Sequence, residues 1–331
     1  MNTDINTEMT ENDLRPYRVG ALMYVPALDL GVGKKICANA FPELDSLAFC
    51  LEDAVAENGV KKAESRLAKT LSYIAEHRSE QMPLLFVRVR NCSQFNRLTS
   101  FLGKSTDLLT GAIFPKFDLT NAAEYCAITG KINSDRETPL FIMPILESES
   151  IMRLSTRKRT LLGLRELLDG YKEYVLNIRV GAMDFCNLHG LRRTINQTVY
   201  DIAIVRDVLS DILTVFADDY IVSAPVWEYF SDASDDKTWS IGMENELRLD
   251  IANGFIGKTV IHPSQLPIVR KWMQPTTTDV KDAAAILNWK DDSLGVAKSV
   301  KGNRMNELAT HQKWAKKVLT LAKIYGPRND P

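Results

Sequence analysis

The stretch VLNIRVGAMDFCNLHGLRR, residues 175–193, decides the fold. An apolar run with the composition of a β-strand ends at Gly181. Asp184 follows shortly after, and then a basic segment begins. The same pattern occurs upstream in PLFIMPILESE, residues 139–149, where an apolar run ends at Glu147. Parallel α/β barrels gather carboxylates at the C-terminal ends of separate strands, and hard divalent cations bind such oxygen ligands. The two stretches therefore predict a barrel with a metal site at one mouth.

Short apolar runs alternate with longer amphipathic stretches along most of the chain. The strand candidates are residues 21–25, 46–51, 84–89, 111–114, 140–146, 175–180, 220–223 and 257–261. They are nearly continuously apolar, which is typical of strands buried on both faces. Helical patterns separate them, for example at residues 60–76 and 199–216. These repeated β-then-α units predict an α/β fold, a (β/α)8 TIM barrel.

An open doubly wound sheet is the alternative arrangement, and it normally carries a glycine-rich phosphate loop after its first strand. Residues 25–35 read VPALDLGVGKK, which contains neither a GxGxxG nor a GxxxxGK[ST] pattern. A nucleotide-binding interpretation is therefore weak.

The 331 residues divide into three expected parts, of which the first is a flexible N-terminal arm at residues 1–18. We expect an arm because this segment is polar and lacks periodicity. Residues 19–275 form the expected barrel domain, since such a barrel takes about 250 residues. Residues 276–331 form an expected C-terminal helical extension. It is too small for a core of its own, so it should pack on the barrel or on a neighbouring subunit.

Bulk composition limits the classes of partner. The 41 basic and 42 acidic side chains nearly balance, whereas nucleic-acid-binding domains usually have a basic excess. No apolar run reaches the roughly 18 residues of a membrane span. The five cysteines form no CxxC pair, and together with the lack of a signal peptide they indicate a reducing cytoplasm. We therefore expect a cytoplasmic protein with a small-molecule partner, no nucleic acid and no membrane.

Charged side chains follow successive predicted strands. They are Glu52 and Asp53 in CLEDAV, Arg88 in FVRVRN, Lys116 in FPKF, Glu147 in ILESE and Asp184 in GAMDF. On a barrel these strand ends all face the same mouth. Any single one is interpreted equally well as a strand-terminal charge that reaches solvent. Their convergence indicates a site, because a buried charge must be paired or bound to a metal.

Glu147 and Asp184 come from different strands and, with water completing the shell, suit Mg2+, which prefers oxygen ligands at about 2.0–2.1 Å. Zinc is disfavoured, because the four histidines form no ligand cluster. A metal held this way would chelate a 2-oxo acid and polarise its carbonyl, stabilising an enolate. Arg88 would clamp the substrate carboxylate. These residues predict that a carbon–carbon bond is made or broken beside a carbonyl.

The order of the motifs also resembles a known family. The motifs are LEDAV at 51–55, FPK at 114–116, LES at 146–148, GAMD at 181–184 and GFIGKTVIHPSQ at 254–265. Over about residues 19–275, the chain resembles the citrate lyase beta-subunit-like branch of the HpcH/HpaI aldolase/citrate lyase family. It is similar as well to the divergent TIM-barrel carbon–carbon bond lyases associated with tellurium resistance.

The resemblance implies a Mg2+-dependent carbon–carbon lyase. Such an enzyme cleaves or condenses a small 2-oxo acid or an acyl-CoA through a metal-stabilised enolate. The implied metal ligands are Glu147 and Asp184, the implied substrate-binding residue is Arg88, and the implied catalytic residues are Glu52, Asp53 and Lys116. The resemblance and the amphipathic tail also imply a homo-oligomer, a trimer or a multiple of it.

The chain departs from the family pattern at positions that carry proton transfer. Cys50 stands where the family usually writes the first Asp of DLEDAV, and Asp53 stands where the aldolase branch has a His base. In the tail, Asn306 falls at the Asp of malyl- and citramalyl-CoA enzymes, and a neutral amide cannot act as a general base. The alternative is therefore a non-catalytic or regulatory relative that binds an acyl-CoA, a nucleotide or a protein partner on the same barrel.

Overall fold

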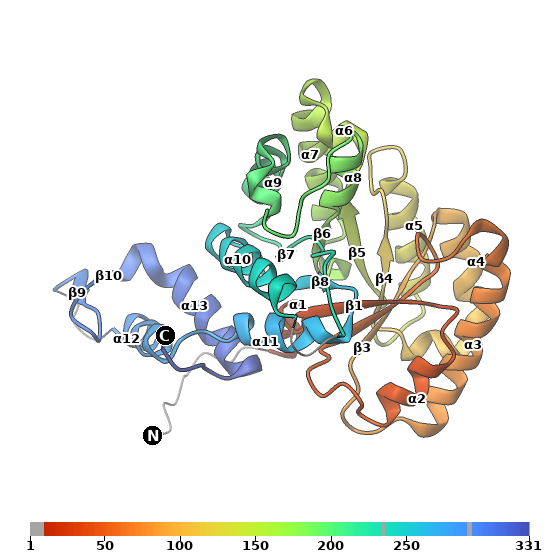
Figure 1. The fold of residues 1–331 in the computed structure, drawn as a ribbon, viewed down its shortest axis with the longest axis horizontal. Coiled ribbons are helices and arrows are strands. Elements are labelled where there is room, and N and C mark those ends of the chain that lie inside the picture. The colour runs from red at the N-terminus through yellow and green to blue at the C-terminus, as the bar shows by residue number, and fades with distance from the viewer. Residues whose placement is uncertain (1–9, 233–235, 290–292, 331) are drawn as a thin grey trace. The chain divides into compact units, whose positions relative to one another are not determined.

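A computed structural model of the chain describes residues 10–232, 236–289 and 293–330. Parallel strands form an eight-stranded sheet in the order β7-β6-β5-β4-β3-β2-β1-β8 (Figure 1). The strands are β1 (Ala21–Pro26), β2 (Ser46–Cys50), β3 (Leu84–Arg88), β4 (Gly111–Phe114), β5 (Phe141–Leu146), β6 (Ile178–Val180), β7 (Val222–Ser223) and β8 (Lys258–Val260). A parallel bridge between Ala224 and Lys258 joins the two edges of the sheet. The sheet therefore closes into a barrel.

The TIM-barrel prediction is confirmed, and the open doubly wound sheet is excluded. Each strand lies within its predicted run, except that Pro26 extends β1 by one residue. Buried apolar side chains of successive strands form one cluster that includes Leu22, Ala48, Phe86 and Met143. Since residues of β1 and β5 meet in this cluster, it fills the inside of the barrel.

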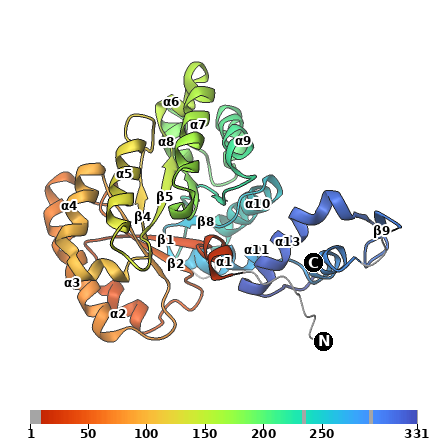
Figure 2. The same cartoon turned by 180° about the vertical axis from the view of Figure 1, so that it is seen from behind.

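Helices cover the outer surface of the barrel (Figure 2). They are α2 (Gly31–Cys37), α3 (Val60–His77), α4 (Cys92–Leu102), α5 (Ala122–Asn133), α6 (Glu149–Met152), α7 (Leu154–Asp169), α8 (Ala182–Asn187), α9 (Ala203–Phe216) and α10 (Thr238–Asn253). In α3 the buried residues Ala63, Leu67, Leu71 and Ile74 recur at helical spacing and form its inner face. Among the helices that the structure describes, none is long and apolar enough to cross a membrane.

The chain forms two compact units, one of which is the barrel at residues 19–268. The other unit combines the N-terminal segment before residue 19 with residues 269–331. Its elements are α1 (Glu11–Arg18), the end of α11 (Leu266–Met273), α12 (Thr277–Leu287), β9 (Val296–Lys298), β10 (Met305–Glu307) and α13 (Leu308–Tyr325). Apolar side chains of α12 and α13, among them Ile286 and Leu319, form its core.

Part of the segment for which we expected a flexible arm is helical. Residues 11–18 form α1, with Glu11 and Asp13 in its first turn and Arg18 in its last turn. These charges complement the helix dipole. The hydroxyl of Tyr325 in α13 donates to the carbonyl of Tyr17 at 2.7 Å. So short a segment shows no helical periodicity in the sequence. Its contact with the far end of the chain leaves no local signal either. The rest of the expected arm, residues 1–9, lies outside the described residues.

Candidate active site

The structure brings all the predicted site residues together at the C-terminal mouth of the barrel. Glu52 and Asp53 follow β2, Arg88 ends β3, Lys116 follows β4, Glu147 follows β5, and Asp184 lies in α8 directly after β6. Two cations, Arg88 and Lys116, join the carboxylates into one network.

Arg88 is the central cation of this network. Its Nη2 lies 2.7 Å from Oε2 of Glu52, 3.1 Å from Oδ2 of Asp53 and 3.6 Å from Oε1 of Glu147. The residue is only 7% exposed, and its buried Nε has no hydrogen-bond partner among the described residues. A buried donor without a partner is costly. The free Nε–H of Arg88 is therefore suited to a bound anionic group.

Lys116 has a strained backbone, and it contacts both carboxylates of the predicted metal pair. Its φ is 48°, in the left-handed region that residues other than glycine rarely adopt. Its backbone N–H donates to Oε1 of Glu147 at 2.9 Å. Its Nζ lies 3.2 Å from Oε1 of Glu52 and 3.7 Å from Oδ1 of Asp184. Backbone strain of this kind concentrates at functional sites, which supports a role for Lys116 beyond packing.

Glu147 fits against the barrel because residue 181 is glycine. A Cβ atom at Gly181 would lie 1.9 Å from Oε2 of Glu147, so any larger residue would displace the carboxylate. Burial raises the pKa of Glu147 to about 7; the charge of Arg88 opposes this rise, and the charge of Asp184 adds to it. A cation between the two carboxylates would stabilise both in their ionised forms.

Glu52 and Asp53 are adjacent but have opposite pKa shifts. Burial raises the pKa of Glu52, against the charge of Arg88. Burial also acts to raise the pKa of Asp53, but hydrogen bonding with Glu52 and the charges of Arg88 and Lys116 prevail and lower it. Neighbouring acids whose pKa values are pushed apart are a common arrangement for general acid–base chemistry.

Arg90 positions the loop that carries these two acids, a role that we did not predict. Its Nη1 donates to the carbonyl oxygens of Leu51 at 3.2 Å, Glu52 at 3.3 Å and Val55 at 3.0 Å. The sequence contains only a weak signal for this role, a second arginine two residues after the strand-end arginine. Two inward-facing residues of the barrel, Tyr24 and Arg179, were missed altogether, because both lie within apolar runs.

The comparisons with known proteins agree with this geometry. The family model for C–C bond lyases of the TIM-barrel fold matches residues 13–327. The chain belongs to this family. The resemblance to citrate lyase beta-like proteins that the motifs indicated is confirmed. None of the curated proteins compared matches the chain significantly.

Solved structures similar to this family member include citrate lyase-like proteins. CitE from Mycobacterium tuberculosis, in complex with magnesium, acetoacetate and coenzyme A, is 20% identical; the match covers 92% of this chain and 99% of that chain, with a TM-score of 0.59. A citrate lyase from Burkholderia xenovorans LB400 is 16% identical over 94% of this chain and 93% of that chain, with a TM-score of 0.70. The citrate lyase beta subunit from M. tuberculosis, complexed with oxaloacetate and magnesium, is 21% identical over 78% of this chain and 99% of that chain, with a TM-score of 0.51. At these identities the likeness establishes the fold.

The residues at the mouth of this C–C bond lyase-family barrel fit a magnesium ion. No group of three or more His, Cys, Asp or Glu side chains in the described ranges is arranged to hold a metal, which argues against a closed protein cage. Mg2+ usually keeps several waters and takes one or two carboxylates from the protein. The pair Glu147 and Asp184, with the space that Gly181 leaves for Glu147, matches that requirement.

Asn306, the departure in the tail, has a structural partner within its own unit. Its side chain is buried, and its Nδ2 donates to Oδ1 of Asp282 at 3.2 Å. Arg304 also donates to Asp282, at 2.8 Å. An aspartate at position 306 would face the buried carboxylate of Asp282, whereas the amide donates to it. The neutral side chain at this position therefore has a local physical reason.

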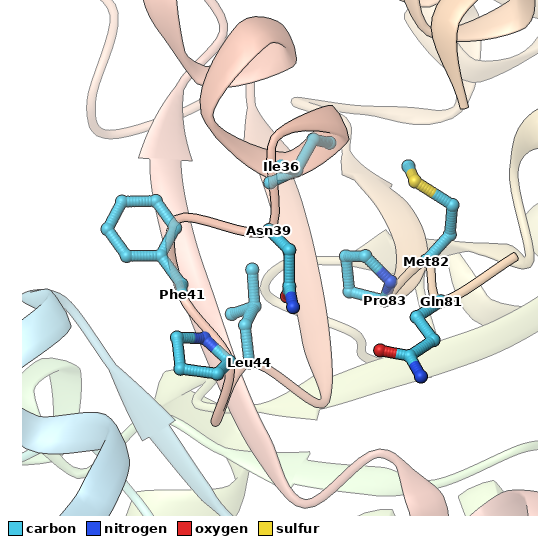
Figure 3. A pocket seen from close by; sticks show the side chains of 8 residues that line it. Ile36, Asn39, Phe41, Leu44, Gln81, Met82 and Pro83 are labelled. Carbon is cyan, nitrogen blue, oxygen red and sulfur yellow. The ribbon is translucent and has the colours of Figure 1, made fainter. Parts of the chain in front are cut away.

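A small cavity lies at the other end of the barrel, beside the N-terminal ends of β2 and β3 (Figure 3). Its volume is about 140 Å³, and it is lined by residues within 36–44 and 81–83. Its lining side chains, such as Phe41 and Met82, are not titratable. The active sites of TIM barrels lie at the opposite, C-terminal face, so this cavity is not a candidate active site.

Proposed function

We propose that the protein is a Mg2+-dependent carbon–carbon bond lyase that cleaves or condenses a small 2-oxo acid or its CoA thioester. The observation that carries the proposal is the position of one buried guanidinium, Arg88, with a free Nε, directly beside Glu147. The charge of Asp184 acts on the same carboxylate and helps to raise its pKa. Similar structures are complexes with magnesium and oxaloacetate, and with magnesium, acetoacetate and coenzyme A, which supports the same chemistry.

Glu147 and Asp184 would hold the metal ion. Bound there, Mg2+ supplies a Lewis acid that polarises the carbonyl of the oxo acid. Lys116 orients Glu147 through its backbone N–H and lies near Asp184 through its Nζ. It thereby contacts both carboxylates of the proposed metal pair.

Arg88 would bind the carboxylate of the substrate. Its Nη2 is held by Glu52 and Asp53, while its Nε has no partner among the described residues. A carboxylate on Nε would satisfy the buried donor and fix the oxo acid beside Glu147. Arg88 would thus fix the orientation of the oxo acid in the site.

Glu52 would transfer the proton that carbon–carbon bond cleavage requires. Burial raises the pKa of Glu52, so its carboxyl holds a proton more readily than an exposed glutamate does. Nζ of Lys116, 3.2 Å from Oε1 of Glu52, would stabilise the carboxylate left after transfer. Asp53, with a lowered pKa, would stay ionised and hold Arg88 in place.

The test is a turnover screen of the purified protein with Mg2+. Oxaloacetate, pyruvate, acetyl-CoA and malyl-CoA are incubated singly and in pairs, and products are followed by NMR. We expect consumption of at least one oxo acid or thioester, and none with Glu52→Gln. The control Glu149→Gln removes an exposed acid that pairs with Arg153 on the surface and should retain activity. Binding without turnover would refute the lyase and favour a regulatory, ligand-binding relative.

The pKa of Glu147 predicts the pH dependence of metal binding. Since this pKa is raised from 4.5 to about 7, a proton must leave before the metal binds. Mg2+ affinity should therefore rise as the pH increases, by up to about tenfold per pH unit below the pKa. Calorimetry across this range measures the effect, and a pH-independent affinity would contradict the assignment.

The stability of the metal-free protein should change in the opposite direction. Between pH 4.5 and about pH 7, folded Glu147 holds a proton that the unfolded chain releases. Stability must therefore fall as the pH rises through this window, and the loss is complete above the folded pKa. Chemical denaturation in EDTA should show this slope, and Glu147→Gln should reduce it.

A cytoplasmic location, homo-oligomeric assembly and the three-part division of the chain stay predictions from the sequence. Each concerns a property outside the mouth of the barrel. The turnover screen does not depend on any of them.

A further inference from the structure

Arg179 is a buried cation for which the described residues provide no counter-ion. It lies in β6 and is 1% exposed. Its Nη2 donates to Oγ1 of Thr259 at 2.6 Å, while its Nε and Nη1 are buried without a hydrogen-bond partner among the described residues. Lys258, the comparable buried cation of β8, is by contrast paired with Glu246 at 2.9 Å and Asp250 at 2.7 Å. Lys258 therefore has acidic partners, whereas Arg179 has none among the described residues.

The side chain of Arg179 points into the barrel. Thr259 belongs to β8 and Arg179 to β6, and β7 lies between these strands in the sheet, so their contact passes across the interior. The phenol of Tyr24, on β1, is a further neighbour of Arg179. Three strands therefore direct polar side chains to the same place inside the barrel.

The same tyrosine also lies against the substrate-binding arginine. Cζ of Arg88 is 5.5 Å from the centroid of the Tyr24 ring. Arg88 and Arg179 thus both border Tyr24, and each has at least one buried donor that no described residue accepts. Two guanidinium groups with buried donors that no described residue accepts therefore lie beside one phenol.

We infer that Arg179, with Tyr24 and Thr259, forms a second anion-binding subsite that receives a second carboxylate of the substrate, so that the preferred substrate is a small dicarboxylic oxo acid. The inference rests on the proposed function for the role of Arg88 as the first carboxylate site. Deep burial favours a carboxylate over the phosphates of coenzyme A, because a buried subsite admits a compact group. A carboxylate also accepts hydrogen bonds from guanidinium, phenol and hydroxyl donors alike.

The electrostatics of the two arginines agree with this inference. Burial lowers the pKa of Arg179, and the neighbouring phenol only partly opposes it. Arg88 is also buried, but Tyr24 and the carboxylates Glu147 and Glu52 raise its pKa. A bound carboxylate would give Arg179 the counter-ion that Arg88 already has.

Arg179→Met tests the subsite, because methionine keeps an unbranched chain and removes the charge. Binding of oxaloacetate, a dicarboxylate, and pyruvate, a monocarboxylate, is measured by calorimetry with Mg2+ and again in EDTA. The variant should lose about tenfold or more in affinity for oxaloacetate while its affinity for pyruvate stays within about twofold. Thr259→Val keeps the shape of the side chain and removes the hydroxyl. This variant should lose less affinity for oxaloacetate than Arg179→Met does, again with little change in the affinity for pyruvate.

Folding controls separate this role from a structural one. Replacing an unpaired buried charge with an apolar side chain should leave the melting temperature of Arg179→Met unchanged or raise it. A lowered melting temperature with unchanged preference for oxaloacetate would show a structural arginine and overturn the subsite. Equal losses of affinity for oxaloacetate and pyruvate would overturn the subsite as well.

The outcome is distinguishable from failure of the proposed function. If Arg179→Met loses oxaloacetate selectively but the native protein turns over no substrate, the subsite stands and the lyase proposal fails. If the native protein is an active lyase and Arg179→Met keeps its preference among substrates, the lyase proposal stands and the subsite is overturned.

Discussion

Glu147→Gln is expected to weaken Mg2+ binding by about 100-fold or more, and Asp184→Asn by a similar factor. Each substitution removes one charged oxygen ligand from a site to which the protein supplies two. Amide and carboxylate have nearly the same shape, so the barrel should stay folded. Calorimetric titration measures the affinity, and circular dichroism verifies the fold.

The chain offers close controls for this experiment. Glu149 lies two residues after Glu147, is exposed, and forms an i,i+4 pair with Arg153 on the surface. Glu149→Gln should leave Mg2+ affinity unchanged. If both Glu147→Gln and Asp184→Asn bound Mg2+ as the native protein does, the metal site would have to lie elsewhere.

Arg88→Met should have the largest effect on both stability and ligand binding. The substitution removes the cation that Glu52, Asp53 and Glu147 share, and Glu52 and Glu147 are themselves buried. Breaking a buried ion pair by removing one partner typically costs about 3–5 kcal/mol. Binding of pyruvate and oxaloacetate should be lost together, because both would use Arg88. Urea denaturation and calorimetry measure the two effects.

Arg88→Lys and Arg153→Met separate charge, geometry and surface effects. Lysine keeps the charge but lacks the planar fork, so it should recover part of the stability and little of the carboxylate binding. Arg153 pairs with Glu149 at the surface, and its replacement should change stability by no more than about 1 kcal/mol. Native pyruvate affinity in a folded Arg88→Met protein would exclude Arg88 as the carboxylate site.

Much of the site was predictable because a parallel barrel imposes a simple rule. The C-terminal ends of its strands meet at one mouth, so a charge at the end of an apolar run is placed without further information. Glu147 and Asp184 follow such runs, and Lys116 contacts both of them at the mouth of the barrel, as that rule requires.

Other features of the site left no signal in the sequence, for reasons that are specific to each residue. The backbone of Lys116 is left-handed, and its N–H donates to the carboxylate of Glu147, 31 residues away in the sequence. The sequence indicates only that an apolar run ends at Gly181. In the structure, this glycine leaves space for Glu147. Arg179 alternates with apolar neighbours in IRV, and only barrel closure shows which side of β6 faces inward.

The sequence by itself determined the barrel, the order of its strands' charged ends and the acidic pair at its mouth. These follow from local hydrophobic patterns and from the requirement that parallel strands end on one side. Only the tertiary structure decided which charges are paired and which are not. Pairing depends on distances across the barrel, so it separates Arg88, held by three carboxylates, from Arg179, for which the described residues provide none.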